Sequence, residues 1–155
     1  MNNTNKLINW HESLASVVSK NFSSEAIAEL LKGMECLVSA SSGIVTVFPY
    51  ALPPQSTHHR LLANEDPKRQ VDTYDAGAYL LDPFYRAALD EKAEGPFRVK
   101  DVSPGGFEES EYYNLFYKGL GFIDEICILF QFEDQAIVIV SVVRHAVENP
   151  FIEAD

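Results

Sequence analysis

The N-terminal third of the chain has the apolar spacing of amphipathic helices. From Ser24 onward, apolar residues three or four positions apart form one stripe, made of Ile27, Leu30, Leu31, Met34, Leu37 and Val38. Ser23 or Ser24 can accept a backbone N–H at the start of this helix. A preceding helix is predicted over residues 6–19, with four residues facing inward: Ile8, Leu14, Val17 and Val18. We expect both helices to cover a sheet.

Runs rich in β-branched residues, bounded by proline and glycine, predict strands further along. Residues 43–50 are predicted to form the first strand. Pro49 and the Pro53-Pro54 pair end it. Residues 58–62 are a second candidate, and residues 97–102 are typical of an edge strand. The polar segment 64–72 is predicted to be a loop.

Capping residues mark the start of two more helices. Asp82 is a good N-cap and Pro83 is tolerated at the first helical position. The helix that follows has a short apolar face of Phe84, Ala87, Ala88 and Leu89. Ser110 caps a second predicted helix, which ends near the glycines at 119–121. Its aromatic residues are Tyr112, Tyr113, Phe116 and Tyr117.

The strongest tertiary signal is a hairpin over residues 123–145, whose two apolar runs flank Asp134-Gln135. A two-residue turn there pairs Glu133 with Ala136 and sets Glu125 opposite Arg144. This register assigns Ile126, Ile128, Phe130, Ile139 and Val143 to one face and Cys127, Leu129, Val138, Val140 and Val142 to the other. Because both faces are apolar, the sheet must be covered on both sides.

The order of these elements predicts an α+β domain with a mainly antiparallel sheet covered by helices on both faces. The N-terminal helices close one side, and the aromatic segments between Tyr74 and Tyr117 close the other. The 155 residues are expected to form a single domain, residues 1–155.

Charge and composition exclude several classes of protein. Lys and Arg number 12 against 23 Asp and Glu, a net charge of -11, so this segment is not expected to bind nucleic acid. No apolar run approaches the roughly 20 residues that cross a bilayer, and the N-terminus lacks a secretory signal, so no membrane partner is expected. Two distant cysteines offer no disulfide framework, which favours a reducing cytoplasm.

No catalytic constellation or cofactor motif is found in the sequence. The adjacent His58 and His59 would point to opposite faces of a strand, so they are poor joint metal ligands. Cys127 lies among aliphatic residues in a predicted strand, where a packing thiol is expected rather than a nucleophile. We therefore predict no catalytic residues, no metal, no cofactor and no enzymatic activity.

Two features do suggest a binding site. Residues 74–117 hold ten of the 18 aromatic residues, and six of the ten carry a hydroxyl, which suits an apolar pocket with convergent polar groups as well as it suits an ordinary core. The second feature is the Glu125–Arg144 pair on an otherwise apolar strand face. It is either a cross-strand salt bridge or an arginine that receives a ligand carboxylate or carbonyl.

Four motifs resemble a known family: Leu81-Asp82-Pro83-Phe84-Tyr85, Ser110-Glu111-Tyr112-Tyr113, Asp124-Glu125 and Ser141-x-x-Arg144. Together, over about half the chain, they resemble the GAF-like sensory domain that precedes the helix-turn-helix in LuxR-type bacterial transcription regulators. The resemblance implies a GAF/PAS-like antiparallel sheet flanked by helices, a small-molecule pocket on one face, and dimerisation through helices.

A further similarity links Tyr74, Tyr79 and Asp82-Pro83 to the autoinducer-binding relatives. There the aspartate before the proline accepts the amide N–H of an acyl-homoserine lactone, so the similarity implies this role for Asp82, in competition with helix capping. Those relatives also carry a tryptophan where this chain has Phe97-Arg98-Val99. That departure argues against a homoserine lactone, though not against another ligand.

These observations predict a domain that senses an unidentified small-molecule effector, as a homodimer. The predicted ligand-binding residues are Tyr74, Tyr79, Asp82, Phe84, Tyr85, Tyr112, Tyr113, Phe116, Glu125 and Arg144. DNA would be contacted only through a helix-turn-helix, for which residues 145–155 are too few. The alternatives are an interaction module that dimerises through Ile27, Leu31 and Met34, and a GAF-fold enzyme. A pocket of roughly 300 Å³ or more beneath the tyrosines would favour sensing.

Overall fold

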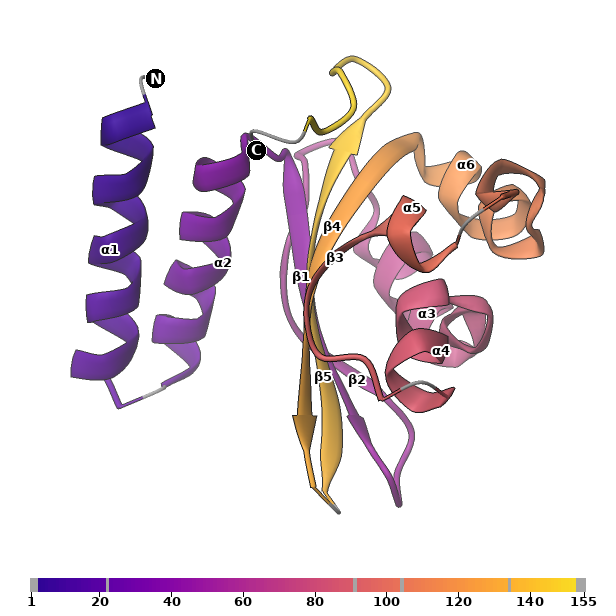
Figure 1. Cartoon of the computed structure of the whole chain (residues 1–155), viewed down its shortest axis with the longest axis horizontal. Coiled ribbons are helices and arrows are strands. Elements are labelled where there is room, and N and C mark those ends of the chain that lie inside the picture. The colour runs from indigo at the N-terminus through magenta and orange to yellow at the C-terminus, as the bar shows by residue number, and fades with distance from the viewer. Residues whose placement is uncertain (1–2, 22, 91, 104, 134, 153–155) are drawn as a thin grey trace.

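Five strands form one antiparallel sheet with helices on both faces (Figure 1), which confirms the predicted α+β class. The computed structural model describes residues 3–21, 23–90, 92–103, 105–133 and 135–152. The strands are β1 (Ser42–Pro49), β2 (Gln55–Arg60), β3 (Gly95–Arg98), β4 (Phe122–Phe132) and β5 (Ala136–His145). They lie in the order β2-β1-β5-β4-β3, so the terminal hairpin occupies the centre of the sheet.

The predicted register of that hairpin is wrong by one residue. Asp124, not Glu125, lies opposite Arg144, and Glu125 lies opposite Val143. The strands are separated by residues 133–135, and Asp134 of the predicted turn lies outside the described residues. The physical reason is turn chemistry, because a two-residue hairpin turn favours the positive φ of glycine or asparagine, and this segment has neither.

The corrected register redistributes side chains between the two faces of the sheet. Odd-numbered residues of both strands face the aromatic segments: Cys127, Leu129, Ile137, Ile139 and Val143. Even-numbered residues face the N-terminal helices: Ile126, Ile128, Val138, Val140 and Val142. The predicted grouping mixed the two sets, because in a strand successive side chains alternate and a shift of one residue exchanges the faces.

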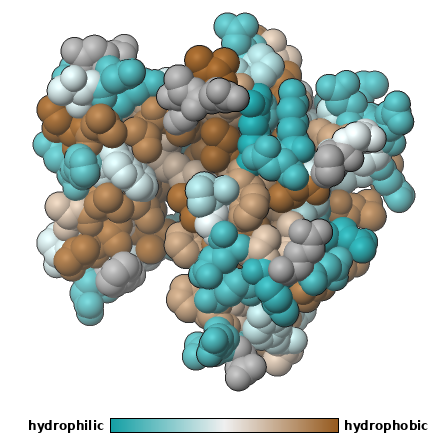
Figure 2. Space-filling view, viewed as in Figure 1, coloured by the Kyte–Doolittle hydropathy of each residue, from teal (hydrophilic) through white to brown (hydrophobic). Residues whose placement is uncertain are grey.

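Helix α2 (Ser24–Val38) covers the even-numbered face, as its apolar stripe predicts. The Ser23 hydroxyl accepts the Ala26 N–H at 3.3 Å and so caps the helix. Helix α1 (Asn3–Ser19) packs against α2 on the side away from the sheet (Figure 1). Consequently Ile8 and Val18 remain 49% and 72% exposed, and only Val17 of the four predicted inward residues is buried. Brown apolar side chains show at the left of Figure 2, over these helices.

Short helical turns cover the opposite face. They are η1 (Lys68–Asp72), α3 (Thr73–Ala76), η2 (Ala78–Leu81), α4 (Pro83–Asp90), α5 (Val99–Val102), η3 (Phe107–Glu109), η4 (Tyr113–Tyr117) and α6 (Lys118–Leu120). The predicted loop 64–72 therefore ends in a π-helical turn. The predicted edge strand 97–102 is extended only to Arg98, since Asp101 accepts the Arg98 N–H at 2.9 Å and starts α5.

Candidate functional site

A small cavity lies between the sheet and the tyrosine-rich cover. Its walls are Gly43, Ile44, Thr46, Gln70, Tyr74, Asp82, Tyr112, Phe116, Phe122, Glu125, Ile139, Ser141 and Val143. The cavity has a volume of about 30 Å³, which is enough for a water-sized group and well below the roughly 300 Å³ of a ligand pocket. In this packed arrangement the aromatic cluster is therefore mostly core.

Asp82 holds the start of α4 and faces the cavity at the same time. Its Oδ1 accepts the Phe84 N–H at 2.8 Å, which confirms the predicted cap. Its Oδ2 accepts a hydrogen bond from the Tyr74 hydroxyl. The capping role of Asp82 is therefore present, and its second oxygen is bonded to a tyrosine of the cavity wall. Burial raises the pKa of Asp82 to about 6, against the opposing effect of these hydrogen bonds.

Glu125 is the second carboxyl group in the cavity, and it is also buried. Burial first, and then the negative charge of Asp82, raise the pKa of Glu125 to about 8, although a hydrogen bond with Ser141 opposes the shift. Among the described residues that line the cavity, none has a basic side chain. The two carboxyl groups are therefore not neutralised from within the cavity wall.

Gln70 contributes a third acceptor, which the sequence reasoning missed. The side chain is only 5% exposed, and its Oε1 has no hydrogen-bond partner. A buried acceptor without a partner costs about 1–3 kcal/mol. Gln70 lay in the segment predicted to be a polar loop, where nothing in the spacing distinguishes one polar residue from the next.

The structure brings together half of the predicted ligand-binding residues. Tyr74, Asp82, Tyr112, Phe116 and Glu125 line the cavity. Tyr79 and Tyr85 instead pack on Phe48 and line a separate hollow of about 290 Å³. Phe84 is fully buried in the core, and Tyr113 packs edge-on against Phe107. These last four residues do not reach the cavity.

Arg144 lies on the opposite face of the sheet and does not join the site. Its guanidinium donates to the carbonyls of Ser39 at 3.1 Å, Pro150 at 3.2 Å and Asn149 at 3.3 Å, and also to that of Val38. It lies 4.0 Å from the centroid of the Phe151 ring. Both alternatives considered for a Glu125–Arg144 pair therefore fail, because Arg144 connects the end of α2 to the C-terminal segment.

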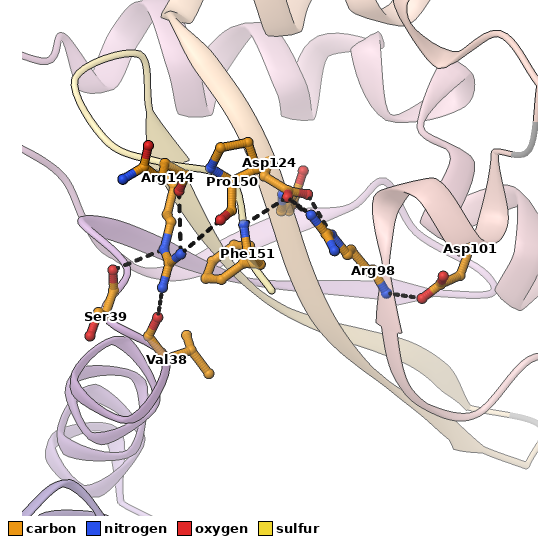
Figure 3. A network of polar contacts seen from close by, with 10 residues as sticks. Val38, Ser39, Arg98, Asp101, Asp124, Arg144, Pro150 and Phe151 are labelled. Carbon is orange, nitrogen blue, oxygen red and sulfur yellow. Dashed lines mark hydrogen bonds and ion pairs between the residues drawn. The ribbon is translucent and has the colours of Figure 1, made fainter. Parts of the chain in front are cut away.

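Asp124, the actual cross-strand neighbour of Arg144, is bound by other groups (Figure 3). It forms a two-pronged ion pair with Arg98 and accepts the Phe151 N–H at 2.9 Å. The two adjacent acidic residues of β4 thus serve opposite faces. Asp124 anchors the C-terminal segment, and Glu125 faces the cavity.

Comparison with known proteins gives a likeness at the level of fold. The structure is similar to the ligand-binding domain (LBD) of VqsR from Pseudomonas aeruginosa, with a TM-score of 0.69 and 23% sequence identity, covering 87% of this chain and 79% of that one. No protein-family model matches the sequence, and no curated protein matches it closely.

The part of the chain that the structure describes lacks two further features. It contains no cluster of three or more His, Cys, Asp or Glu side chains able to hold a metal ion. Within the same residues, no helix has both the length and the apolar character needed to span a membrane. The Cys127 thiol is fully buried in the aromatic core, and burial raises its pKa.

Proposed function

We propose that this chain is the small-molecule-sensing domain of a LuxR-type bacterial transcription regulator, acting in the cytoplasm. The likeness to the VqsR ligand-binding domain supports a sensing role at the level of fold. The observation that carries the proposal is the group of buried acceptors from Gln70, Asp82 and Glu125 around one cavity, whose described lining residues include no basic side chain. Groups so placed lose hydration without gaining an internal counter-charge, which a ligand can supply.

Sensing requires that the cover move, because the packed cavity admits only a water-sized group. The cover consists of turns three to eight residues long rather than of long helices. Elements of this kind open at a lower free-energy cost than a sheet. A ligand would favour the arrangement in which the cover stands further from the sheet, and only its preference for that arrangement could change the output. DNA would be contacted through a separate helix-turn-helix.

A thermal-shift screen with acyl lactones, aromatic acids, amines and fractionated cell extract tests this proposal. A ligand present at about 100 times its dissociation constant should stabilise the fold by about 2.7 kcal/mol. Asp82→Asn should weaken that response, while Asp90→Asn, at an exposed position of the helix that Asp82 caps, should leave it intact. Unchanged melting temperatures with every fraction would rule out sensing at this site.

A ligand-free dimerisation module is the second candidate, favoured by the small cavity and by the apolar surface of α1. The predicted contact through Leu31 and Met34 is wrong, because both side chains are buried against the sheet. We propose instead that the dimer forms through the exposed residues of α1, which include Ile8 and Val18.

Sedimentation velocity tests the dimer through Val18→Asp. A charge at this position should convert a dimer to a monomer, since it would be buried at the contact without a partner. Val147→Asp, at an exposed position in the turn after β5, is the matched control and should remain dimeric. A monomer for the unmodified chain at high concentration would contradict the dimer directly.

A further inference from the structure

The acceptors of the cavity come from three separate parts of the fold. Gln70 is in η1, Asp82 precedes α4, and Glu125 is in the central strand β4. The remaining wall combines four aromatic residues, Tyr74, Tyr112, Phe116 and Phe122, with aliphatic and hydroxyl-bearing side chains. An enclosed site therefore combines carboxyl and amide oxygens with ring surfaces.

Acidic groups act on Glu125: the charges of Asp82 and Asp124 both raise its pKa. The titratable groups that act on it or feel its charge are Asp82, Asp124, Tyr74, Tyr112, Tyr117 and Cys127. Arg98 of β3 binds Asp124, and Arg144 of β5 binds backbone carbonyls on the other face of the sheet. The carboxyl groups of the cavity wall would thus attract a positive charge placed inside the cavity.

We propose that this cavity holds a primary ammonium group of the effector, with Gln70 Oε1 and the carboxylates of Asp82 and Glu125 as its acceptors. The inference rests on the proposed sensing function and adds to it the chemical class of the ligand. An effector larger than methylammonium would extend its remaining atoms beneath the tyrosine cover.

Three properties of the site select this group. A primary ammonium has three N–H donors and no acceptor, which matches one amide oxygen and two carboxylates. The volume of about 30 Å³ accommodates a water-sized head group, whereas a guanidinium or a quaternary ammonium is larger. The aromatic rings add cation–π attraction, while a phosphate or carboxylate ligand would be repelled by the acidic pair.

Binding of methylammonium to the whole chain, measured by isothermal titration calorimetry from pH 6 to pH 8, is the direct test. The pKa of Glu125 is raised to about 8. Below that pH, the affinity should increase about tenfold for each unit by which the pH rises, because the cation binds the ionised carboxylate and binding displaces the proton of Glu125. Tetramethylammonium chloride at equal ionic strength should not bind. Equal binding of both cations, or no methylammonium binding into the high millimolar range, would overturn the assignment.

Variants separate binding from structural support. Glu125→Gln should remove the tenfold change per pH unit, leaving only the smaller contribution of Asp82 near pH 6, and should weaken methylammonium binding at pH 8 by tenfold or more. Glu35→Gln is the matched control, because Glu35 is also buried with an unpartnered oxygen but lies in α2, on the other side of the sheet, paired with Arg60 at 2.8 Å. The affinity of the Glu35→Gln variant for methylammonium should equal that of the unmodified chain.

Gln70→Leu keeps the test decisive if the glutamate variant folds poorly. Removing an unpartnered acceptor should raise the melting temperature of the free protein. The same change should weaken methylammonium binding, which a merely structural role of Gln70 would not do. If Gln70→Leu binds as tightly as the unmodified chain, Gln70 is not a ligand of the ammonium group and the proposed site is wrong.

The two proposals fail in different ways. If a neutral effector from the screen stabilises the chain while methylammonium does not, the ammonium site is overturned and sensing stands. If neither binds, both are overturned.

Discussion

Replacing Asp124 by Ala is expected to lower the free energy of unfolding by about 3–5 kcal/mol. The carboxylate is fully buried and pairs with Arg98, so its removal takes the counter-charge from a guanidinium that is largely buried. The same change removes the acceptor from the N–H groups of Phe151, at 2.9 Å, and Glu125, at 3.0 Å. Urea denaturation followed by circular dichroism measures the loss.

An exposed ion pair supplies the control for Asp124. Asp90 and Arg86 lie 3.5 Å apart in α4, and each side chain is more than half exposed. Asp90→Ala should therefore change the stability by less than about 0.5 kcal/mol. If the Asp124 variant lost no more than the Asp90 variant, the network of Figure 3 would contribute little to the fold.

Stability should fall as the pH rises from about 4.5 to about 8, because of Glu125. Its pKa is raised to about 8 in the folded state from an ordinary value of 4.5, so the folded chain binds this proton more tightly than the unfolded chain does. The stabilisation by the proton is complete below the ordinary pKa and is lost as the pH rises through the folded pKa. Asp82 adds a further loss of stability between pH 3.8 and about pH 6, because its pKa is raised in the same direction.

Glu125→Gln should reduce the dependence of folding stability on pH as the pH approaches 8. A neutral amide has no charge to bury, so the variant should exceed the unmodified chain at pH 8 by an amount on the order of a few kcal/mol. The amide replaces the acid at equal size, and urea midpoints from pH 5 to pH 9 give the comparison. The same substitution at the exposed Glu108 should leave the profile as it was. Parallel profiles for all three proteins would show that Glu125 does not control the pH response.

The sequence predicted an element well where the contacts that form it join residues close together in the chain. Leu31, Met34 and Val38 of the predicted α2 stripe are buried, and the other three stripe residues are partly buried. Helix periodicity predicts this because the same face of the helix recurs every three or four residues. The caps at Asp82 and Ser110 are present, with Ser110 Oγ accepting the Tyr113 N–H at 3.1 Å. Both depend only on residues two or three positions away. The two covered faces of the sheet also follow from composition, since both faces of its central strands are apolar.

Register and outer layers could not be predicted in the same way. A single residue in the connection 133–135 decides which side of the sheet each strand residue faces, and the sequence there favours no particular turn. This shift separated Glu125 from Arg144 and left the acid without a basic partner in the cavity wall. Similarly, the spacing of the apolar residues in α1 does not indicate that α2 lies between α1 and the sheet.

By itself, the amino-acid sequence determined the α+β class, the capped helix starts and the presence of an aromatic cover, because short-range spacing and capping produce them. Only the tertiary structure decided that Gln70, Asp82 and Glu125 share one enclosed space, and that this space is water-sized in the packed arrangement. Cavity volume and charge balance depend on how distant segments pack, and no local pattern encodes that packing.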